Sequence, residues 1–182
     1  MYGVLAYFDR ETEEKLMGLW EQLVENDISY YSKEYSGKRP HITIADYDEL
    51  DEGEFKEYMD IYYEQITRIP VNFATLGSFI GSGALLLTPT MSKELLNFHR
   101  EYHDNFKMFR NNKKSLYLPG KWIPHCTIAN RLKKNKLAEA LLFCTEKLKP
   151  FKGYISEVAL IKLKYNGEDC IGVEEIYSKK LI

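Results

Sequence analysis

The sequence predicts an α+β fold built from two similar halves. A hexapeptide occurs twice: residues 40–45 read PHITIA and residues 124–129 read PHCTIA, which agree at five of six positions. Each copy follows a strand-like and then a helical stretch, and precedes another helical one, so a β-α-β-α order repeats. We therefore expect two lobes in a pseudo-symmetric duplication, with mainly antiparallel sheets, a central cleft and helices outside. The length suits a single domain, 1–182, with halves of about 1–84 and 85–182.

The first half contains two strand-and-helix units. Residues 3–9 (GVLAYFD) predict a buried strand, and residues 10–26 predict a helix behind an acidic first turn. After a polar connector, residues 41–47 (HITIADY) predict a strand, and a second helix is expected from about Glu52 to Ile66. The apolar side chains that recur at helical spacing are Leu16, Leu19, Trp20 and Leu23 in the first helix and Phe55, Met59, Tyr62, Tyr63 and Ile66 in the second.

The second half repeats this order. It is reached through residues 70–90, which predict two strands joined by a Gly-Ser-Gly turn, because Gly supplies the positive φ of tight hairpins. A helix capped by Ser92 follows, then a basic loop, and then residues 125–131 (HCTIANR) as a strand. The remaining predicted elements are a helix over 135–148 and a closing hairpin of strands over 155–165 and 170–178.

Charge is distributed unevenly along the chain. The net charge of −2 argues against a protein that coats nucleic acid over its whole surface. Residues 46–64 carry nine acids and one base, whereas residues 107–136 carry nine bases and no acid. A polyanion would therefore be bound locally, around the second copy of the repeat.

The sequence favours a cytoplasmic protein without membrane contact, and a monomer. Cysteines 126, 144 and 170 form no closely spaced pair, which predicts buried thiols in place of a disulfide framework or a cysteine zinc site. No apolar run is long enough to cross a bilayer. The opening MYGVLAYFDRETEE lacks the basic start, apolar middle and cleavage site of a secretory signal.

Strand alternation places the polar residues of the repeat on one face. In the first copy His41, Thr43 and Ala45 share a face, opposite Ile42 and Ile44. The second copy repeats this pattern. Because the apolar face must enter a core, an imidazole, a hydroxyl and a methyl group point the other way, twice.

Two such faces across a pseudo-twofold axis suit a phosphate group. The hydroxyls of Thr43 and Thr127 would donate to non-bridging oxygens, with His41 and His125 in line with the entering and leaving oxygens. One neutral imidazole would accept a proton from the nucleophile, and one cationic imidazole would give a proton to the leaving oxygen. An unperturbed pKa of about 6.5 suits both tasks. The motif calls for no metal or cofactor, and it does not decide which histidine is the acid.

The paired tetrapeptides HITI and HCTI resemble the H-x-[ST]-x signatures of the two-histidine (2H) phosphoesterase superfamily, which includes 2′,3′-cyclic phosphodiesterases and 2′-5′ RNA ligases. The resemblance spans nearly the whole chain. It implies that His41 and His125 are the catalytic pair and that Thr43 and Thr127 hold the phosphate. It also implies a metal-independent enzyme without cofactors, which hydrolyses a 2′,3′-cyclic phosphate or a related phosphodiester in RNA ends or small cyclic nucleotides.

The chain departs from the commonest family pattern after each threonine. Ile replaces Leu, and the acidic stretch 45–50 (ADYDEL) stands where RNA-processing members often turn with Gly, which bears on the substrate. Arg131 stands close to where a basic residue commonly follows in the family. Cations hold phosphates and aromatic rings stack on bases, so the further candidates for substrate binding are Lys38, Arg39, Tyr117 and Trp122.

Two further stretches of the sequence resemble functional motifs but lack residues that those motifs require. His99 and His103 share a helix face in HREYH, but the glutamate is misplaced for HExxH or HxxEH, so packing beside Tyr102 and Phe106 is favoured over zinc binding. GSFIGSG has the glycines of a phosphate loop without its Lys, which favours a hairpin turn. The competing function is a non-catalytic module that binds RNA ends or a nucleotide in the same cleft.

Overall fold

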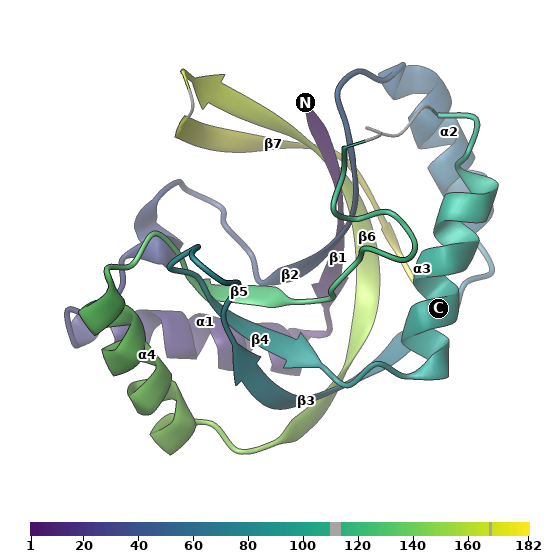
Figure 1. Cartoon of the computed structure of the whole chain (residues 1–182). Helices are drawn as coiled ribbons and strands as arrows, with labels where there is room; N and C mark the ends of the chain where they lie inside the picture. Colours follow the sequence, from purple (N-terminus) through teal and green to yellow (C-terminus); the bar gives the residue numbers. More distant parts are fainter. Residues whose placement is uncertain (110–113, 168) are drawn as a thin grey trace.

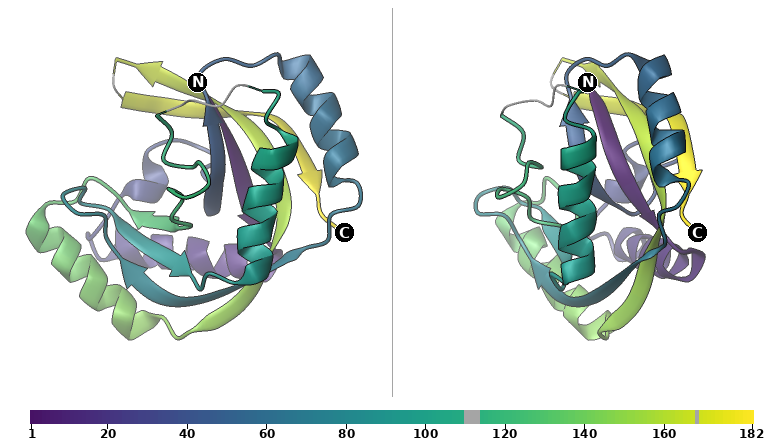
Figure 2. Two further views of the ribbon diagram at one scale, coloured as in Figure 1. Left: turned by 45° about the vertical axis from the view of Figure 1, so that its right-hand side comes forward. Right: turned by 90° about the vertical axis from the view of Figure 1, so that its right-hand side faces the viewer.

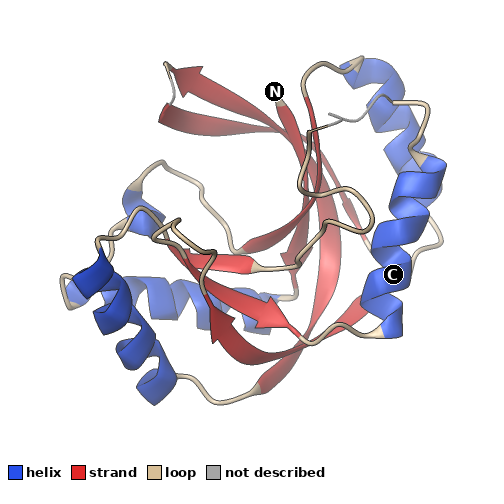
Figure 3. Cartoon of the chain, viewed as in Figure 1, coloured by secondary structure: helices blue, strands red, loops and turns tan. Residues whose placement is uncertain are grey.

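The chain folds around one strongly curved β-sheet with helices outside it (Figure 1; Figure 3). This computed structural model describes residues 1–109, 114–167 and 169–182. The elements in chain order are β1 (Tyr2–Phe8), α1 (Arg10–Glu25), the 3-10 turn η1 (Tyr31–Lys33), β2 (His41–Tyr47), α2 (Glu52–Tyr63), β3 (Ile69–Gly77), β4 (Leu85–Pro89), α3 (Lys93–Asn105), β5 (Cys126–Ala129), α4 (Lys134–Lys147), β6 (Phe151–Asn166) and β7 (Asp169–Lys180). No helix in these residues is long and apolar enough to cross a bilayer.

The order of the strands carries the pseudo-twofold symmetry. It runs β2-β1-β6-β3-β4-β5, with β7 paired to β6, and every pair is antiparallel. Exchanging β1 with β4, β2 with β5 and β6 with β3 reverses this order onto itself. The predicted α+β duplication is confirmed, with one difference. The separate sheets that we expected are one continuous sheet, because β3 and β6 pair across its middle. The division of the chain near residue 84 stays a prediction.

The helices pack through the apolar stripes that the sequence marks. Ser92 caps α3 as predicted, since its side chain accepts a hydrogen bond from the Leu95 N–H. Helices α2 and α3 lie side by side, whereas α1 contacts α4 elsewhere on the molecule (Figure 2). Aromatic rings join α2 to α3, and those of Phe55 and Phe106 lie 5.3 Å apart.

GSFIGSG forms the turn between β3 and β4, as its glycines predict. Gly81 and Gly83 have φ values of 79° and 66°. At Gly83 a Cβ atom would lie 2.4 Å from the backbone oxygen of Leu132, so the turn packs directly on the chain that follows β5.

The strands that carry the repeated motif stand at opposite ends of the strand order, yet they lie against each other (Figure 1). The curvature of the sheet brings its ends together. On both strands the apolar side chains of the motif face the core, as predicted: Ile42, Ile44, Cys126 and Ile128 are fully buried. Cys144 is buried too, whereas Cys170 is only half-buried.

Candidate active site

The two copies of the motif face one shared cavity. His41, Thr43, His125 and Thr127 all line a hollow of about 390 Å³ at the junction of β2 and β5. The four residues that the sequence predicts to meet are thus brought together, and their catalytic roles stay predictions. Lys38, Tyr117 and Arg131 line the same hollow.

A β-bulge in each strand changes which residue follows the threonine into the cavity. In β2 the register passes from Thr43 to Ala45, so Ile44 is an extra residue, and Ile128 is the equivalent extra residue in β5. Simple alternation placed Ala45 and Ala129 on the cavity side, and this was wrong, because both are buried with the isoleucines. The residues that line the cavity are Asp46 in β2 and Asn130 after β5.

The two imidazoles are held in the same way. The Nδ1 atoms of His41 and His125 lie 2.7 Å from the backbone oxygens of Arg39 and Ile123, each two residues earlier in the chain. A carbonyl only accepts, so each Nδ1 carries the hydrogen in this arrangement and the Nε2 atom is left to exchange a proton. An aromatic edge flanks each ring, from Tyr7 at 6.3 Å and from Phe79 at 4.9 Å between centroids.

Burial disfavours the charged form of both imidazoles. It lowers the pKa of His41 to about 4, and the charges of Lys38, His125 and Arg39 lower it further against the opposing hydrogen bond to Arg39. Burial also lowers the pKa of His125, where the hydrogen bond to Ile123 opposes the shift. The cations near His41 distinguish the two environments.

Two tyrosines contact the threonines in equivalent ways. Tyr31 interacts through its hydroxyl with the Thr127 side chain, and Tyr117 with that of Thr43. Both tyrosines come from the connection that precedes the motif strand in their half of the chain. Tyr117 was predicted to line the site, whereas Tyr31 was not.

Lys38 supplies a cation at the wall of the cavity. Its Nζ atom donates to Glu34 at 2.6 Å and to the backbone oxygen of Tyr31 at 2.9 Å, and it lies 3.5 Å from the centroid of the Tyr31 ring. Burial lowers the pKa of Lys38, and the hydrogen bond to Glu34 opposes this. Arg131 lines the same hollow, with φ at 56°, and its charge also lowers the pKa of Lys38.

Comparison with known proteins agrees with this geometry. A model of the 2'-5' RNA ligase superfamily matches residues 12–167. The chain belongs to the 2'-5' RNA ligase superfamily. No curated protein sequence matches this superfamily member significantly.

Solved structures of other proteins share the fold. Escherichia coli LigT complexed with 3'-AMP aligns with a TM-score of 0.59 at 10% identity, covering 99% of this chain and 97% of LigT. LigT complexed with NADP+ gives 0.58 at 10% identity, with 99% and 96% covered. The protein TT0787 of Thermus thermophilus gives 0.60 at 11% identity, with 99% and 97% covered. At such identities the likeness shows the fold alone.

Two of the predicted substrate-binding residues of this superfamily member do not line the cavity. Arg39 is turned toward carboxylates: its Nε and Nη2 atoms donate to Glu13 at 2.7 and 3.0 Å, and Nη2 also donates to Glu157 at 3.1 Å. Trp122 is 8% exposed, and its Nε1 atom donates to the backbone oxygen of Thr43 at 2.9 Å. It braces the motif strand from behind instead of offering its face to a base.

The histidine pair of α3 belongs to the same buried layer. His99 and His103 are 1% and 7% exposed, and their Nε2 atoms lie 3.1 Å apart. The same two atoms lie 2.7 Å from the backbone oxygen of Tyr117 and 3.2 Å from that of Ile44. Among the described residues, no group of three or more His, Cys, Asp or Glu side chains could hold a metal ion.

Among the described residues of the basic run 107–136, Arg131 is the one base that lines the cavity. Two of its members, Arg110 and Lys113, lie outside the described residues. Lys136 points elsewhere and contacts Glu139 and the backbone of Asp27.

Sequence reasoning missed several residues of the site. Asp46 and Asn130 were missed because regular strand alternation was assumed, and no local sequence pattern indicates the two bulges. Tyr35 and Tyr165 also line the cavity, from the connector before β2 and from the end of β6. The aromatic content of that connector could have indicated these residues, since Tyr31 and Tyr35 both place their rings against the Nζ atom of Lys38.

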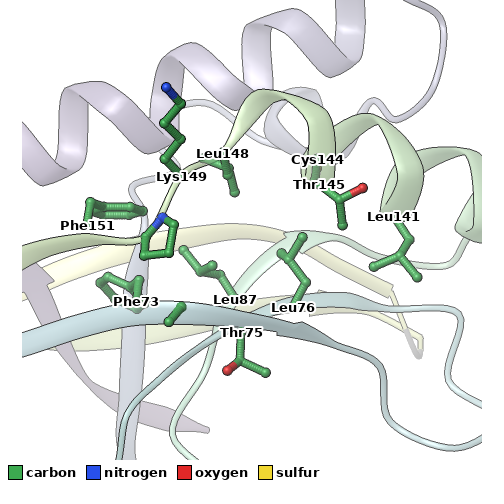
Figure 4. A pocket seen from close by; sticks show the side chains of 12 residues that line it. Phe73, Thr75, Leu76, Leu87, Leu141, Cys144, Thr145, Leu148, Lys149 and Phe151 are labelled. Carbon is green, nitrogen blue, oxygen red and sulfur yellow. The ribbon is translucent and has the colours of Figure 1, made fainter.

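A second hollow of similar size lies away from the motifs. It is formed by β3, β4, α4 and the start of β6, and its volume is about 390 Å³ (Figure 4). Apolar side chains such as Phe73, Leu76, Leu87 and Phe151 make up most of its wall. Its lining residues include Lys149 and Cys144 but no acid or histidine.

Proposed function

We propose that this chain is a metal-independent phosphodiesterase, which hydrolyses a 2′,3′-cyclic phosphate or a related phosphodiester in RNA or a nucleotide. The main support is the matched pair of imidazoles, His41 and His125. Both line one cavity, and the Nδ1 atom of each is hydrogen-bonded to a backbone oxygen. Two positioned proton-transfer groups supply what this reaction needs. Among structural neighbours, LigT has been crystallised with 3'-AMP and with NADP+, which supports a nucleotide substrate.

The reaction would proceed by in-line displacement at phosphorus. A water oxygen forms a bond to phosphorus while one imidazole takes the water proton at Nε2. The bond from phosphorus to the ribose 2′ or 3′ oxygen breaks, and the other imidazole gives that oxygen a proton. The hydroxyls of Thr43 and Thr127, with the Lys38 cation nearby, would stabilise the charge on the non-bridging oxygens.

We assign the base to His41 and the acid to His125. Lys38 and Arg39 place positive charge near His41, which favours its neutral form, whereas no cation of the described residues contributes to the pKa shift of His125. A substrate phosphate between the two rings would raise the pKa of both and so charge the acid. The reverse reaction exchanges the two roles.

The test measures turnover of the four common nucleoside 2′,3′-cyclic phosphates, with and without a chelator. His41→Ala and His125→Ala should each lower kcat about 10²- to 10⁴-fold with the fold intact by circular dichroism. Thr43→Val should also slow the reaction, whereas Thr75→Val, on the exposed face of β3, is the matched control. If both histidine variants turned over the substrate at the parent rate, catalysis by His41 and His125 would be ruled out. Tight nucleotide binding without turnover in the parent protein would favour the binding module instead.

A further inference from the structure

Asp46 is a carboxylate in the cavity that the chemistry of phosphate transfer does not use. The bulge at Ile44 brings it to the cavity side of β2. Its Oδ1 atom is buried and accepts no hydrogen bond. Among the described residues, no donor reaches this Oδ1 atom.

Asp46 as a whole is half-buried, so the cost of burial falls on its Oδ1 atom. A buried acceptor without a donor typically destabilises a protein by about 1–3 kcal/mol, and a charged one by more. The nearest aspartate along the chain, Asp48, is exposed and has no such cost. Asp46 is therefore suited to accept hydrogen bonds from a bound molecule, which would recover that cost on binding.

The position of Asp46 shows which part of a substrate it faces. With Ile44 as the extra residue of the bulge, Asp46 lies two register steps beyond Thr43 along β1, which corresponds to roughly 7 Å at about 3.3 Å per residue. It is on the side of Thr43 away from His41. A carboxylate repels a phosphate, so the group that it binds belongs to the part of the nucleotide remote from phosphorus.

Aromatic side chains surround this end of the cavity. Burial raises the pKa of Tyr117 and of Tyr165, and the charge of Asp46 adds to both shifts, which places the carboxylate near both hydroxyls. Both rings line the cavity. Tyrosine faces stack on nucleobases, so a base, more than a sugar, fits this end.

We propose that Asp46 is a specificity residue that selects guanine, which rests on the phosphodiesterase function proposed above. A carboxylate presents two acceptors side by side. Guanine presents two N–H donors side by side, at N1 and N2. Adenine offers one donor beside an acceptor on its corresponding edge, and cytosine and uracil likewise offer no adjacent pair of donors. Charge-assisted paired hydrogen bonds of this kind discriminate between bases by roughly 10- to 100-fold.

The experiment compares kcat/KM for the 2′,3′-cyclic phosphates of guanosine, inosine and adenosine. The wild-type chain should prefer guanosine over adenosine by about 10- to 100-fold, and inosine, which lacks the N2 donor, should fall below guanosine. Asp46→Asn replaces one acceptor by donors, so the paired acceptors that match N1–H and N2–H of guanine are lost, while the amide can pair with adenine. Asp46→Asn and Asp46→Ala should both abolish the preference, and Asp48→Asn should leave it unchanged.

Binding of guanosine and adenosine 3′-phosphates, measured by calorimetry, separates this inference from the function on which it rests. If both cyclic substrates are hydrolysed at equal rates, and Asp46→Asn leaves their ratio unchanged, the specificity role is wrong and the phosphodiesterase stands. If nothing is hydrolysed but guanosine 3′-phosphate binds at least tenfold tighter in an Asp46-dependent way, the specificity role stands and the hydrolytic function is wrong. Equal binding of both nucleotides without turnover would overturn both.

Discussion

The rings of His99 and Trp122 stack in parallel, with centroids 3.9 Å apart and an angle of 3° between their planes. This stack joins α3 to the back of the first motif strand, because the Trp122 Nε1–H donates to the backbone oxygen of Thr43. His103 extends the contact to the oxygen of Ile44. The layer thus fixes the backbone of the strand immediately beneath the threonine that faces the cavity.

Replacing Trp122 by Phe should remove the hydrogen bond while keeping an aromatic ring in the stack. The buried oxygen of Thr43 then loses its donor, so we expect a loss of about 1–3 kcal/mol in the free energy of unfolding, together with a fall in kcat. Trp20→Phe is the matched control, because the buried Nε1 atom of Trp20 has no partner to lose. Urea denaturation and turnover measure both effects. Equal losses in the two variants would show that ring size, not the hydrogen bond, matters.

Stability should fall as the pH is lowered from about 6.5 towards 4. Burial lowers the pKa of all four histidines, to about 4 for His41 and His99. In that range the histidines of the unfolded chain bind protons and those of the folded chain do not, so the free energy of unfolding falls as the pH is lowered. We expect a loss on the order of 1–2 kcal/mol per strongly shifted histidine by pH 5.

Urea denaturation across this range measures the effect. The His99→Phe variant, which no longer carries one of the buried imidazoles, should show a shallower slope than the parent chain. A free energy of unfolding that stayed constant between pH 7 and pH 5 would contradict the assignment of neutral buried histidines.

The pH dependence of kcat/KM should respond to Lys38. A neutral His41 is needed as base, so the rate should rise through the pKa of His41, about 4 in the free protein. It should fall again as His125 loses its proton, below pH 6.5 because burial lowers that pKa. Lys38→Met removes a cation that lowers the His41 pKa, and should move the rising limb to higher pH. A rising limb that stays in place or moves to lower pH would show that another group is the base.

Gly83 should tolerate no side chain. Alanine there would meet the Leu132 oxygen at 2.4 Å and would also adopt a positive φ, so we expect a loss of roughly 1–3 kcal/mol in stability. Gly81→Ala is the control, because its φ is equally positive but no atom lies within 4 Å of the added Cβ. Thermal denaturation of both variants separates the clash from the backbone strain. A Gly83 variant no less stable than its control would show that the turn moves freely away from Leu132.

Much of the site follows from the repeat itself. Two copies of His-x-Thr in a duplicated frame require equivalent positions in space, and the structure brings His41 and His125 to one cavity. Alternation then correctly separated the threonines from the buried isoleucines. It failed one residue later, because a bulge depends on how the neighbouring strand pairs, and nothing within β2 or β5 encodes that pairing locally.

Neighbours in sequence proved a poor guide to binding. Arg39 adjoins the first motif, but the carboxylates of Glu13 and Glu157 come from distant elements and hold it outside the cavity. Trp122 adjoins the second motif, yet α3 covers its face with His99. The sequence alone could not show that Glu13 and Glu157 lie beside Arg39, or that His99 stacks on Trp122, because these contacts depend on the tertiary fold.

The sequence by itself determined the order of elements, the α+β duplication and the pair of histidines with their threonines, because strand periodicity and an internal repeat are local properties of the chain. Tertiary structure alone decided that Asp46 enters the cavity, that Arg39 and Trp122 leave it, and that the ends of one sheet meet. Those outcomes depend on strand register and long-range packing, because the groups that contact each of these side chains come from distant parts of the chain.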